Sequence, residues 1–196
     1  MNLLKRKEKN TLQLIILSLL SLAFIGTELI AQEECRQESL APFVPTPMEI
    51  VEKMLEVAEV NKNDIVYDLG CGDGRIVVMA AEKYGARGVG IDYDPERVAE
   101  AKELVKKKKV EKLVKIIHDD IRNVDYSSAT VVTLYLLYTS NQLLKPYLEK
   151  YLKPGTRVVS HDFSMTGWEP KKTEFYFDEE GSEHTVYLYI ISEQKQ

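Results

Sequence analysis

The sequence contains few cysteines, and this excludes two classes of small domain. Cys35 and Cys71 are the two cysteines among 196 residues, so a network of disulfide bonds cannot hold the fold. Neither belongs to a CxxC pair with histidines at the spacing of zinc ligands, and we therefore expect no metal site. Internal repeats are also missing, and the formal net charge of −5 is the wrong sign for a protein that coats a polyanion. Without a disulfide network or a metal site, an apolar core must stabilise this globular chain.

An apolar run near the N-terminus does not fit a globular domain. Four basic residues between positions 5 and 9 precede a stretch from Leu12 to Ile25 that only three polar residues interrupt. This layout is typical of a secretory signal peptide or of a single membrane anchor, and both alternatives stay open for residues 1–31. Membrane attachment would use residues 11–31. The sequence therefore predicts a membrane-anchored or exported protein.

The rest of the chain predicts a linker over residues 32–44 and one domain over residues 45–192. Residues 46–49 (TPME) have the sequence of a capping box with proline at the first helical position, which predicts a helix from about 47 to 60. Strand-like and helical segments then alternate. Strands are expected at 64–69, 88–92, 114–118, 130–137 and 157–163, and β-rich segments at 173–177 and 185–191. This order predicts an α/β fold with a Rossmann-like, doubly wound sheet of about seven strands, mostly parallel with a C-terminal antiparallel hairpin.

A glycine-rich turn after the first predicted strand carries the main functional signal. Residues 68–75 read DLGCGDGR, and glycines at this place allow positive φ and a close approach of the backbone to a ligand. The GxGxG spacing differs from the GxGxxG of dinucleotide-binding turns, and the Gly-Lys-Ser/Thr ending of a P-loop is missing. An acid at the strand end suits a ligand that carries an amino group. We therefore predict that Asp68, Gly70 and Gly72 bind S-adenosylmethionine.

Acidic residues after the second and third predicted strands extend this site. Asp92 ends the second strand, 24 residues after Asp68, where a carboxylate can accept hydrogen bonds from both ribose hydroxyls. Tyr93 is placed to flank the adenine. Asp119 and Asp120 follow the third strand, and we expect Asp120, which stands farther into the loop, to reach the adenine edge. The alternative that these two neighbours form a general acid and base pair is less favoured, because adjacent residues in a loop point apart.

Together these motifs resemble the class I, seven-stranded S-adenosylmethionine-dependent methyltransferases. The resemblance rests on DLGCGDGR, on GVGID (88–92), HDDI (118–121) and LKPG (152–155), and on the closing hairpin. Residues 42–47, 156–163, 167–168 and 184–189 are in addition similar to segments of small archaeal protein-lysine methyltransferases, and mitochondrial relatives that methylate lysines of inner-membrane proteins share part of the pattern. The similarity covers roughly residues 42 to 192. It implies that Phe43 and Thr46 help to close the cofactor pocket, although the capping box explains Thr46 without a ligand.

Four side chains at the ends of the fourth and fifth predicted strands are candidate catalytic residues. Methyl transfer needs a nucleophile in line with the sulfonium methyl group, and a lysine amine must first lose its proton. We expect Tyr135 and Tyr138 to line the acceptor channel through cation–π contacts and hydrogen bonds. His161 and Asp162 are candidate proton acceptors. The alternatives are core packing for the two tyrosines and a structural role in the loop for His161 and Asp162.

Missing features narrow the acceptor of the methyl group. No Asp/Asn-Pro-Pro-Tyr follows the fourth strand, where adenine and glutamine methyltransferases carry it, and the one cysteine of the domain lies in the glycine-rich turn. Net acidity disfavours nucleic acid. We therefore expect a protein substrate with accessible lysines. A small-molecule methyltransferase and a cofactor-binding domain without catalysis are the alternatives, and the sequence indicates no oligomeric state.

The predicted export conflicts with the predicted cofactor. The positive-inside rule places the domain outside the cytoplasm, whereas S-adenosylmethionine is a cytosolic metabolite. Under this hypothesis residues 1–31 select a substrate close to the membrane.

Overall fold

Seven strands form one twisted sheet in the computed structural model, which describes residues 40–192. The strands are β1 (Ile65–Leu69), β2 (Arg87–Asp92), β3 (Val114–His118), β4 (Val131–Leu134), β5 (Arg157–His161), β6 (Lys172–Phe177) and β7 (Glu183–Ile190). Their order across the sheet is β3-β2-β1-β4-β5-β7-β6. Strands β1 to β5 run parallel, whereas β7 pairs antiparallel with both β5 and β6. The predicted Rossmann-like sheet with an antiparallel C-terminal hairpin is therefore confirmed.

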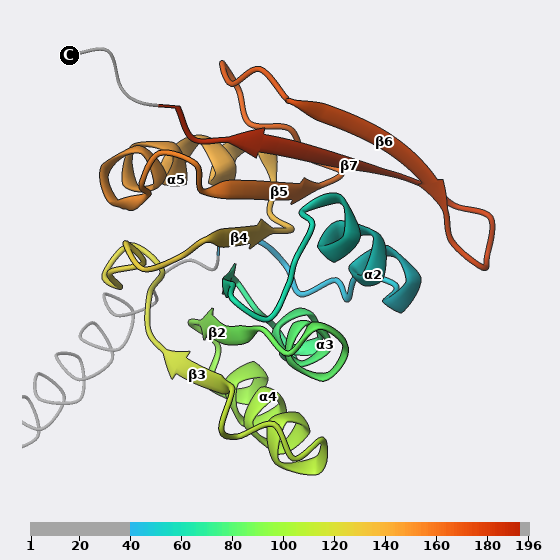
Figure 1. The fold of residues 1–196 in the computed structure, drawn as a ribbon, viewed down its shortest axis with the longest axis vertical. Helices are drawn as coiled ribbons and strands as arrows, with labels where there is room; N and C mark the ends of the chain where they lie inside the picture. The colour runs from blue at the N-terminus through green and yellow to red at the C-terminus, as the bar shows by residue number, and fades with distance from the viewer. Residues whose placement is uncertain (1–39, 193–196) are drawn as a thin grey trace, which may run out of the picture. The chain divides into compact units, whose positions relative to one another are not determined.

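Helices cover both faces of the sheet. The helices are α2 (Met48–Val57), α3 (Arg75–Tyr84), α4 (Pro95–Lys107) and α5 (Tyr138–Tyr151). Figure 1 shows α2, α3 and α4 along one face and α5 on the other. The alternation of side chains along the strands gives each face its own core: Val66, Val131 and Val159 pack toward α2 and α3, and Tyr67, Val132 and Val158 pack toward α5. Burial on both faces explains why the strands read as nearly continuous apolar segments.

Helix α2 begins differently from the prediction. Pro47 is the N-cap residue and not the first helical residue, and no side chain caps the helix. The expected capping box does not form, because the hydroxyl oxygen Oγ1 of Thr46 lies 3.3 Å from Nδ1 of His161 instead. Helix α4 does have a side-chain cap, since the Asp94 side chain accepts a hydrogen bond from Glu96 N and proline follows at the first position.

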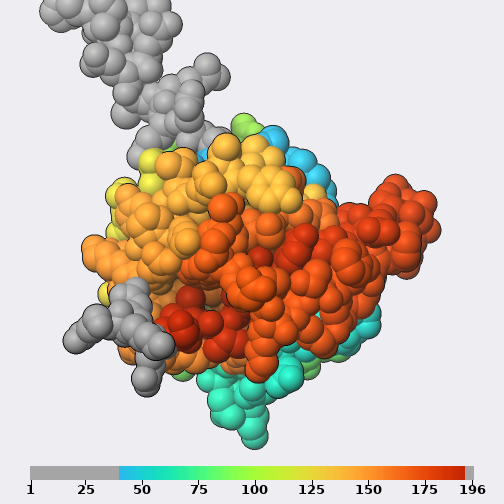
Figure 2. Space-filling model, turned by 90° about the horizontal axis from the view of Figure 1, so that it is seen from above, coloured from blue at the N-terminus to red at the C-terminus, as the bar shows by residue number. Residues whose placement is uncertain are grey.

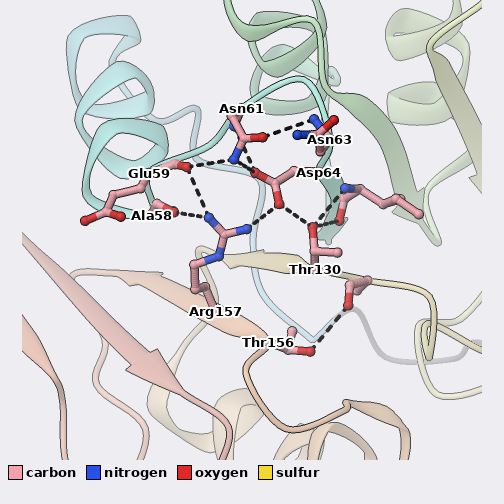
Figure 3. Close-up of polar contacts among 10 residues, drawn as sticks. Ala58, Glu59, Asn61, Asn63, Asp64, Thr130, Thr156 and Arg157 are labelled. Atoms are coloured by element: carbon pink, nitrogen blue, oxygen red, sulfur yellow. Dashed lines mark hydrogen bonds and ion pairs between the residues drawn. The ribbon is translucent and has the colours of Figure 1, made fainter.

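An ion pair at the amino-terminal ends of the parallel strands connects the starts of three of them. Asp64, just before β1, accepts hydrogen bonds from the Arg157 guanidinium and from the Thr130 hydroxyl, the latter at 2.7 Å (Figure 3). Arg157 also donates at 2.6 Å to the carbonyl oxygen of Ala58, at the end of α2. Thr130 Oγ1 in turn accepts from Ile65 N at 2.9 Å. This network fixes β1, β4, β5 and α2 relative to one another at the amino-terminal ends of the parallel strands.

The β6–β7 hairpin projects from the body of the domain, as Figure 2 shows for its orange tip. β6 is an edge strand, and Phe175 and Phe177 are about two-thirds exposed on it, at 64% and 66%. Tyr176 between them packs on the α2 side of the core. The two phenylalanines therefore face away from α2.

No helix in the described part of the chain is suited to span a membrane. Within residues 40–192 no helix has both the length and the apolarity to cross a bilayer, since the apolar side chains of each helix occupy the face that packs on the sheet. Residues 1–31 and most of the expected linker at 32–44 lie outside the described residues.

Candidate functional site at the carboxyl ends of the strands

The sheet reverses its strand order beside β1, which lies between β2 and β4. In open α/β sheets ligands bind at the carboxyl ends of the strands next to such a reversal. Asp68 of β1 and Thr133 of β4 are paired in register at this point, and Thr133 Oγ1 donates a hydrogen bond of 2.7 Å to Asp68 Oδ1. Both side chains are buried. The sheet thus places a carboxyl group at the position where its topology predicts a ligand.

The surroundings of the Asp68 side chain disfavour the ionised form of its carboxyl group. Burial raises its pKa from 3.8 to about 7, and the nearby carboxylates of Asp92 and Asp73 add to the increase, whereas the Thr133 hydrogen bond lowers it. A ligand cation beside this carboxyl would favour its ionised form. The site is therefore suited to an ammonium group.

The glycine-rich turn after β1 is held against β2. The backbone N–H groups of Gly70 and Cys71 both donate to the carbonyl oxygen of Ile91 at 2.9 Å, and Gly72 N donates to Asp92 Oδ2 at 2.7 Å. Gly70, Gly72 and Gly74 have φ of 85°, 52° and 80°, which side chains rarely adopt. The first helical residue, Arg75, follows at once. The three glycines therefore add no side chains of their own between the backbone of the turn and the site.

The segment before α2 folds over this turn. A Cβ atom on Gly72 would overlap the Phe43 ring, so the ring rests directly on the glycine. The Arg97 guanidinium lies 4.6 Å from the centre of the same ring. Arg75 Nη1 donates at 2.7 Å to the carbonyl oxygen of Thr46. Phe43 and Thr46 are thus next to the turn, where the family resemblance placed them.

The predicted ribose and adenine residues lie along the ends of β2 and β3. Asp92 is partly buried, and its Oδ1 accepts from Asp94 N at 2.9 Å. Tyr93 is exposed, and its carbonyl oxygen accepts from His118 Nε2 at 2.9 Å. Asp120 is buried and paired with the Arg122 guanidinium, which lowers its pKa, whereas Asp119 is exposed. This pairing favours Asp119 over Asp120 for a contact with an adenine edge.

Four rings form an aromatic group near the end of β4, those of Tyr135, Tyr138, His161 and Phe163. The Tyr135 ring lies 4.0 Å from the His161 ring, measured between centroids, and is partly buried. Burial raises the pKa of the Tyr135 hydroxyl, and Asp162 adds to the increase. Tyr138, the first residue of α5, is half exposed and meets Phe163 edge to face at 5.1 Å. The two tyrosines therefore lie on the solvent side of His161.

Two histidines and two carboxylates form a cluster across β5 and β7. His161 is fully buried, and its Nε2 lies 2.9 Å from His184 Nδ1. Asp162 follows with φ of 57°, and its Oδ2 lies 3.3 Å from both of these nitrogens. His184 Nε2 in turn contacts Asp178 Oδ2 at 3.3 Å. Burial lowers the pKa of His161 to about 4, so its imidazole is neutral at pH 7.

Thr46 connects the two groups of predicted residues. Its carbonyl oxygen is bound by Arg75 of the glycine-rich turn, and its hydroxyl contacts His161. His184 and Asp178 are neighbours of the predicted catalytic pair that sequence reasoning did not select. The signal was the second histidine in HTVY (184–187), but only the register of β5 with β7 shows that it faces His161.

The sequence of residues 68–172 matches a family described as the ANTKMT methyltransferase domain. This match starts within β1 and covers β2 to β5, together with the glycine-rich turn and the residues of the aromatic group.

Individual relatives match over most of the chain. A protein-lysine N-methyltransferase of Saccharolobus islandicus is 49% identical over 155 residues, which are 79% of this chain and 96% of the relative. A lysine N-methyltransferase of Mus musculus, named for a component of ATP synthase, is 30% identical over 79% of this chain and 60% of its own length. The crystal structure of an RNA methyltransferase of Salinibacter ruber in complex with S-adenosyl-L-homocysteine is 50% identical, with a TM-score of 0.73, over 78% of this chain and 97% of that one.

The archaeal relative also bears on the predicted localisation. Nearly all of its length is accounted for by the 155 aligned residues, so its match to this chain involves no separate membrane segment of its own. The prediction of a membrane-anchored or exported protein is therefore withdrawn.

Proposed function

The chain belongs to the ANTKMT methyltransferase domain family, and from this premise we propose that it transfers the methyl group of S-adenosyl-L-methionine to lysine side chains of proteins. The observation that carries this proposal is the 49% identity to a protein-lysine N-methyltransferase that aligns over 96% of its length. The catalytic unit is the proposed domain of residues 45–192.

The residues at the end of β1 fit the cofactor. A buried carboxyl group whose pKa is raised to about 7 lies at the reversal of strand order, where the ammonium of an amino acid would restore its charge. We assign Asp68 to that ammonium and the backbone of Gly70 and Gly72 to the amino acid portion. Asp92 is assigned to the ribose hydroxyls, and Tyr93 with Asp119 or Asp120 to the adenine. Phe43 and Thr46 close the pocket.

The cofactor supplies an electrophilic methyl group, and the lysine of the substrate protein must present an unprotonated amine in line with it. Removing the proton of a lysine with a pKa near 10.4 costs roughly 4.6 kcal/mol at pH 7. Tyr135 and Tyr138 line the approach and hold the lysine by contacts with their ring faces and hydroxyl groups.

His161 and Asp162 have different roles in preparing the lysine amine for methyl transfer. A neutral imidazole with a pKa of about 4 is a hydrogen-bond acceptor but a weak base. The Asp162 carboxylate, which is 28% exposed, is better able to balance the charge of an entering ammonium. In this proposal His161 orients the amine lone pair and Asp162 accepts the released proton and passes it to solvent.

Incubation with radiolabelled S-adenosyl-L-methionine tests the function. The purified chain is mixed with a cell extract that has been treated either with ribonuclease or with protease. We expect label in protein that survives ribonuclease, and methylated lysine after hydrolysis of that protein. Label that ribonuclease removes would instead support an RNA acceptor, the second candidate, which the name of the Salinibacter ruber relative favours. Label in dialysable compounds alone would support a small-molecule acceptor.

Single substitutions test the catalytic assignment. Tyr135→Phe, Tyr138→Phe, His161→Gln and Asp162→Asn each remove one polar function with little change in size. We expect the rate of methyl transfer to fall with cofactor affinity nearly unchanged, and the largest loss, on the order of 100-fold, for Asp162→Asn. Full rates in all four variants would contradict the assignment.

A further inference from the structure

Three atoms that commonly bind metal ions converge at the junction of β5 and β7. His161 Nε2, His184 Nδ1 and Asp162 Oδ2 are separated by 2.9, 3.3 and 3.3 Å. These residues include two of the three histidines in the sequence. Among the residues that the structure describes, they are the group whose ligand atoms lie close enough together to bind one ion.

Hydrogen bonding alone satisfies these three atoms poorly. Asp178 Oδ2 can only accept from His184 Nε2, and the tautomer of His184 with its proton on Nε2 carries a lone pair on Nδ1. Asp162 Oδ2 is also an acceptor. One proton on His161 Nε2 then serves both neighbours, and the contact between His184 Nδ1 and Asp162 Oδ2 brings two lone pairs together. A cation between the three atoms removes this repulsion.

The spacing fits a divalent transition metal. Zinc binds histidine nitrogen and carboxylate oxygen at about 2.0–2.2 Å, which separates neighbouring ligand atoms by roughly 3.3–3.6 Å at tetrahedral angles and by roughly 2.8–3.1 Å at right angles. The two separations of 3.3 Å match a tetrahedral angle, and the 2.9 Å between the two histidine nitrogens matches an angle near 90°. A point about 2.1 Å from each atom lies about 1 Å outside the plane of the three, which leaves one side open for a further ligand.

Each of the three side chains is oriented by a second contact. His184 Nε2 meets the Asp178 carboxylate, the arrangement that holds most metal-binding histidines. His161 Nδ1 meets the Thr46 hydroxyl, and Asp162 Oδ1 accepts from Thr185 N at 2.9 Å. The His161 side chain is fully buried, that of His184 is 12% exposed and that of Asp162 is 28% exposed, so access is from the carboxylate side.

We propose that His161, Asp162 and His184 bind one divalent transition-metal ion, with Zn²⁺ the best match, and leave a coordination position for water or another ligand. Two histidines and one carboxylate are a common set for ions that keep an open position. This proposal replaces the expectation, drawn from the absence of CxxC motifs, that the chain has no metal site.

The ion would bind the His161 and Asp162 side chains that the proposed methyl transfer needs. Bound metal would therefore inhibit that reaction, a consequence that rests on the proposed function. Metal binding itself is measured without cofactor or acceptor, so its failure and the failure of the proposed function are distinguishable.

Titration of the chelator-treated full chain with Zn²⁺ tests the proposal by calorimetry. We expect one ion per chain, and visible absorption bands of a nitrogen-bound Co²⁺ ion when cobalt replaces zinc. Asp162→Asn and His184→Gln should weaken binding at least 100-fold, and Asp178→Asn, which alters only the contact behind His184, about 10- to 100-fold. His118→Gln is the matched control, because His118 is the remaining histidine and lies outside the cluster.

Circular dichroism melts verify that each variant is folded before binding is compared. Absence of a single saturable Zn²⁺ site in the unmodified chain would overturn the proposal. Binding that survives Asp162→Asn and His184→Gln, or that His118→Gln abolishes, would do so as well. If those two variants do not fold, the cobalt spectrum of the unmodified chain decides, and a spectrum of fully hydrated Co²⁺ would refute the site.

Discussion

Thr133 Oγ1 donates a 2.7 Å hydrogen bond to Asp68 Oδ1 across the paired strands β4 and β1. The two residues sit where the strand order reverses, so a single contact connects the sheet topology with the charge of the site. Burial of Asp68 exceeds the effect of this hydrogen bond and raises its pKa to about 7. The protonation of one buried carboxyl group thus depends on what binds beside it.

Cofactor binding should release a proton near neutral pH. In the free chain Asp68 is largely protonated below pH 7, because its folded pKa is raised, whereas a bound ammonium favours the carboxylate. The affinity for S-adenosyl-L-methionine should therefore increase with pH, by up to about tenfold per unit between pH 5.5 and 7. Calorimetry in two buffers with different ionisation enthalpies measures the proton released.

Asp68→Asn is the control for this linkage. The amide keeps the size of the side chain but cannot ionise, so binding should be at least about tenfold weaker at pH 7.5 and lose its proton release. An affinity of the unmodified chain that does not change between pH 5.5 and 7 would contradict the role of Asp68.

Thr133→Val should shift the pH dependence upward. Valine keeps the shape of threonine and removes the hydrogen bond that lowers the Asp68 pKa, a contact worth roughly 0.5–1.5 kcal/mol, or about 0.4 to 1 pH unit. The midpoint of the affinity increase should move to higher pH by that amount, while the affinity at pH 8 changes little. An unchanged or lower midpoint would show that this hydroxyl does not stabilise the charged form.

Gly72→Ala should weaken cofactor binding strongly. The new Cβ atom would overlap the Phe43 ring, at a residue whose φ is 52°. Gly181→Ala is the matched control, since Gly181 also has positive φ, 85°, but a Cβ atom there meets nothing within 4 Å. Both variants carry backbone strain of about 1 kcal/mol, and the excess loss of affinity in Gly72→Ala reports the clash.

Phe43→Ala combined with Gly72→Ala separates the two causes of that loss. Removal of the ring relieves the contact but not the strain, so part of the affinity should return relative to Phe43→Ala alone. Equal affinities for Gly72→Ala and Gly181→Ala would contradict the close contact.

Asp64→Asn should destabilise the fold without altering the site. The Asp64 side chain is 6% exposed and pairs with Arg157 at the opposite edge of the sheet, and loss of one partner leaves the guanidinium without its counter-charge. Removing one member of a buried ion pair costs about 3–5 kcal/mol. Because Arg157 keeps its contact with the Ala58 carbonyl and is itself 20% exposed, we expect the lower end of this range.

Urea denaturation measures this change, and cofactor titration in the absence of urea serves as the control. The affinity for S-adenosyl-L-methionine should stay within about twofold of that of the unmodified chain, since the ion pair and Asp68 lie at opposite ends of the parallel strands. A change in affinity with no change in stability would contradict the separation of the two networks.

The sequence could bring the proposed cofactor residues together because that half of the site is local. Residues 68–75 are contiguous, and Asp92 ends the neighbouring parallel strand, so knowing that the strands are parallel is enough to bring them to one edge. The pairing of Asp120 with Arg122, two residues away, is a side-chain contact that the sequence pattern does not specify.

The acceptor half depends on contacts that the pattern could not specify. His184 meets His161 because β7 inserts between β5 and β6, in an antiparallel register that places Val186 opposite His161. Thr46 had two competing uses, a helix cap and a contact with His161, and local propensity favoured the one that does not occur. The fourth strand ends at Leu134, earlier than expected, because Leu137 already serves as the N-cap of α5.

The position of β7 in the sheet determines the order in which parts of the domain can form during synthesis on the ribosome. β5 remains an open strand edge until the last element of the domain emerges and pairs with it. The glycine-rich turn can form while translation continues, but His184 reaches His161 only after β7 has been synthesised. A product that ends before β7 would therefore keep Asp68 and the glycine-rich turn, lack half of the histidine pair and leave the edge of β5 unprotected.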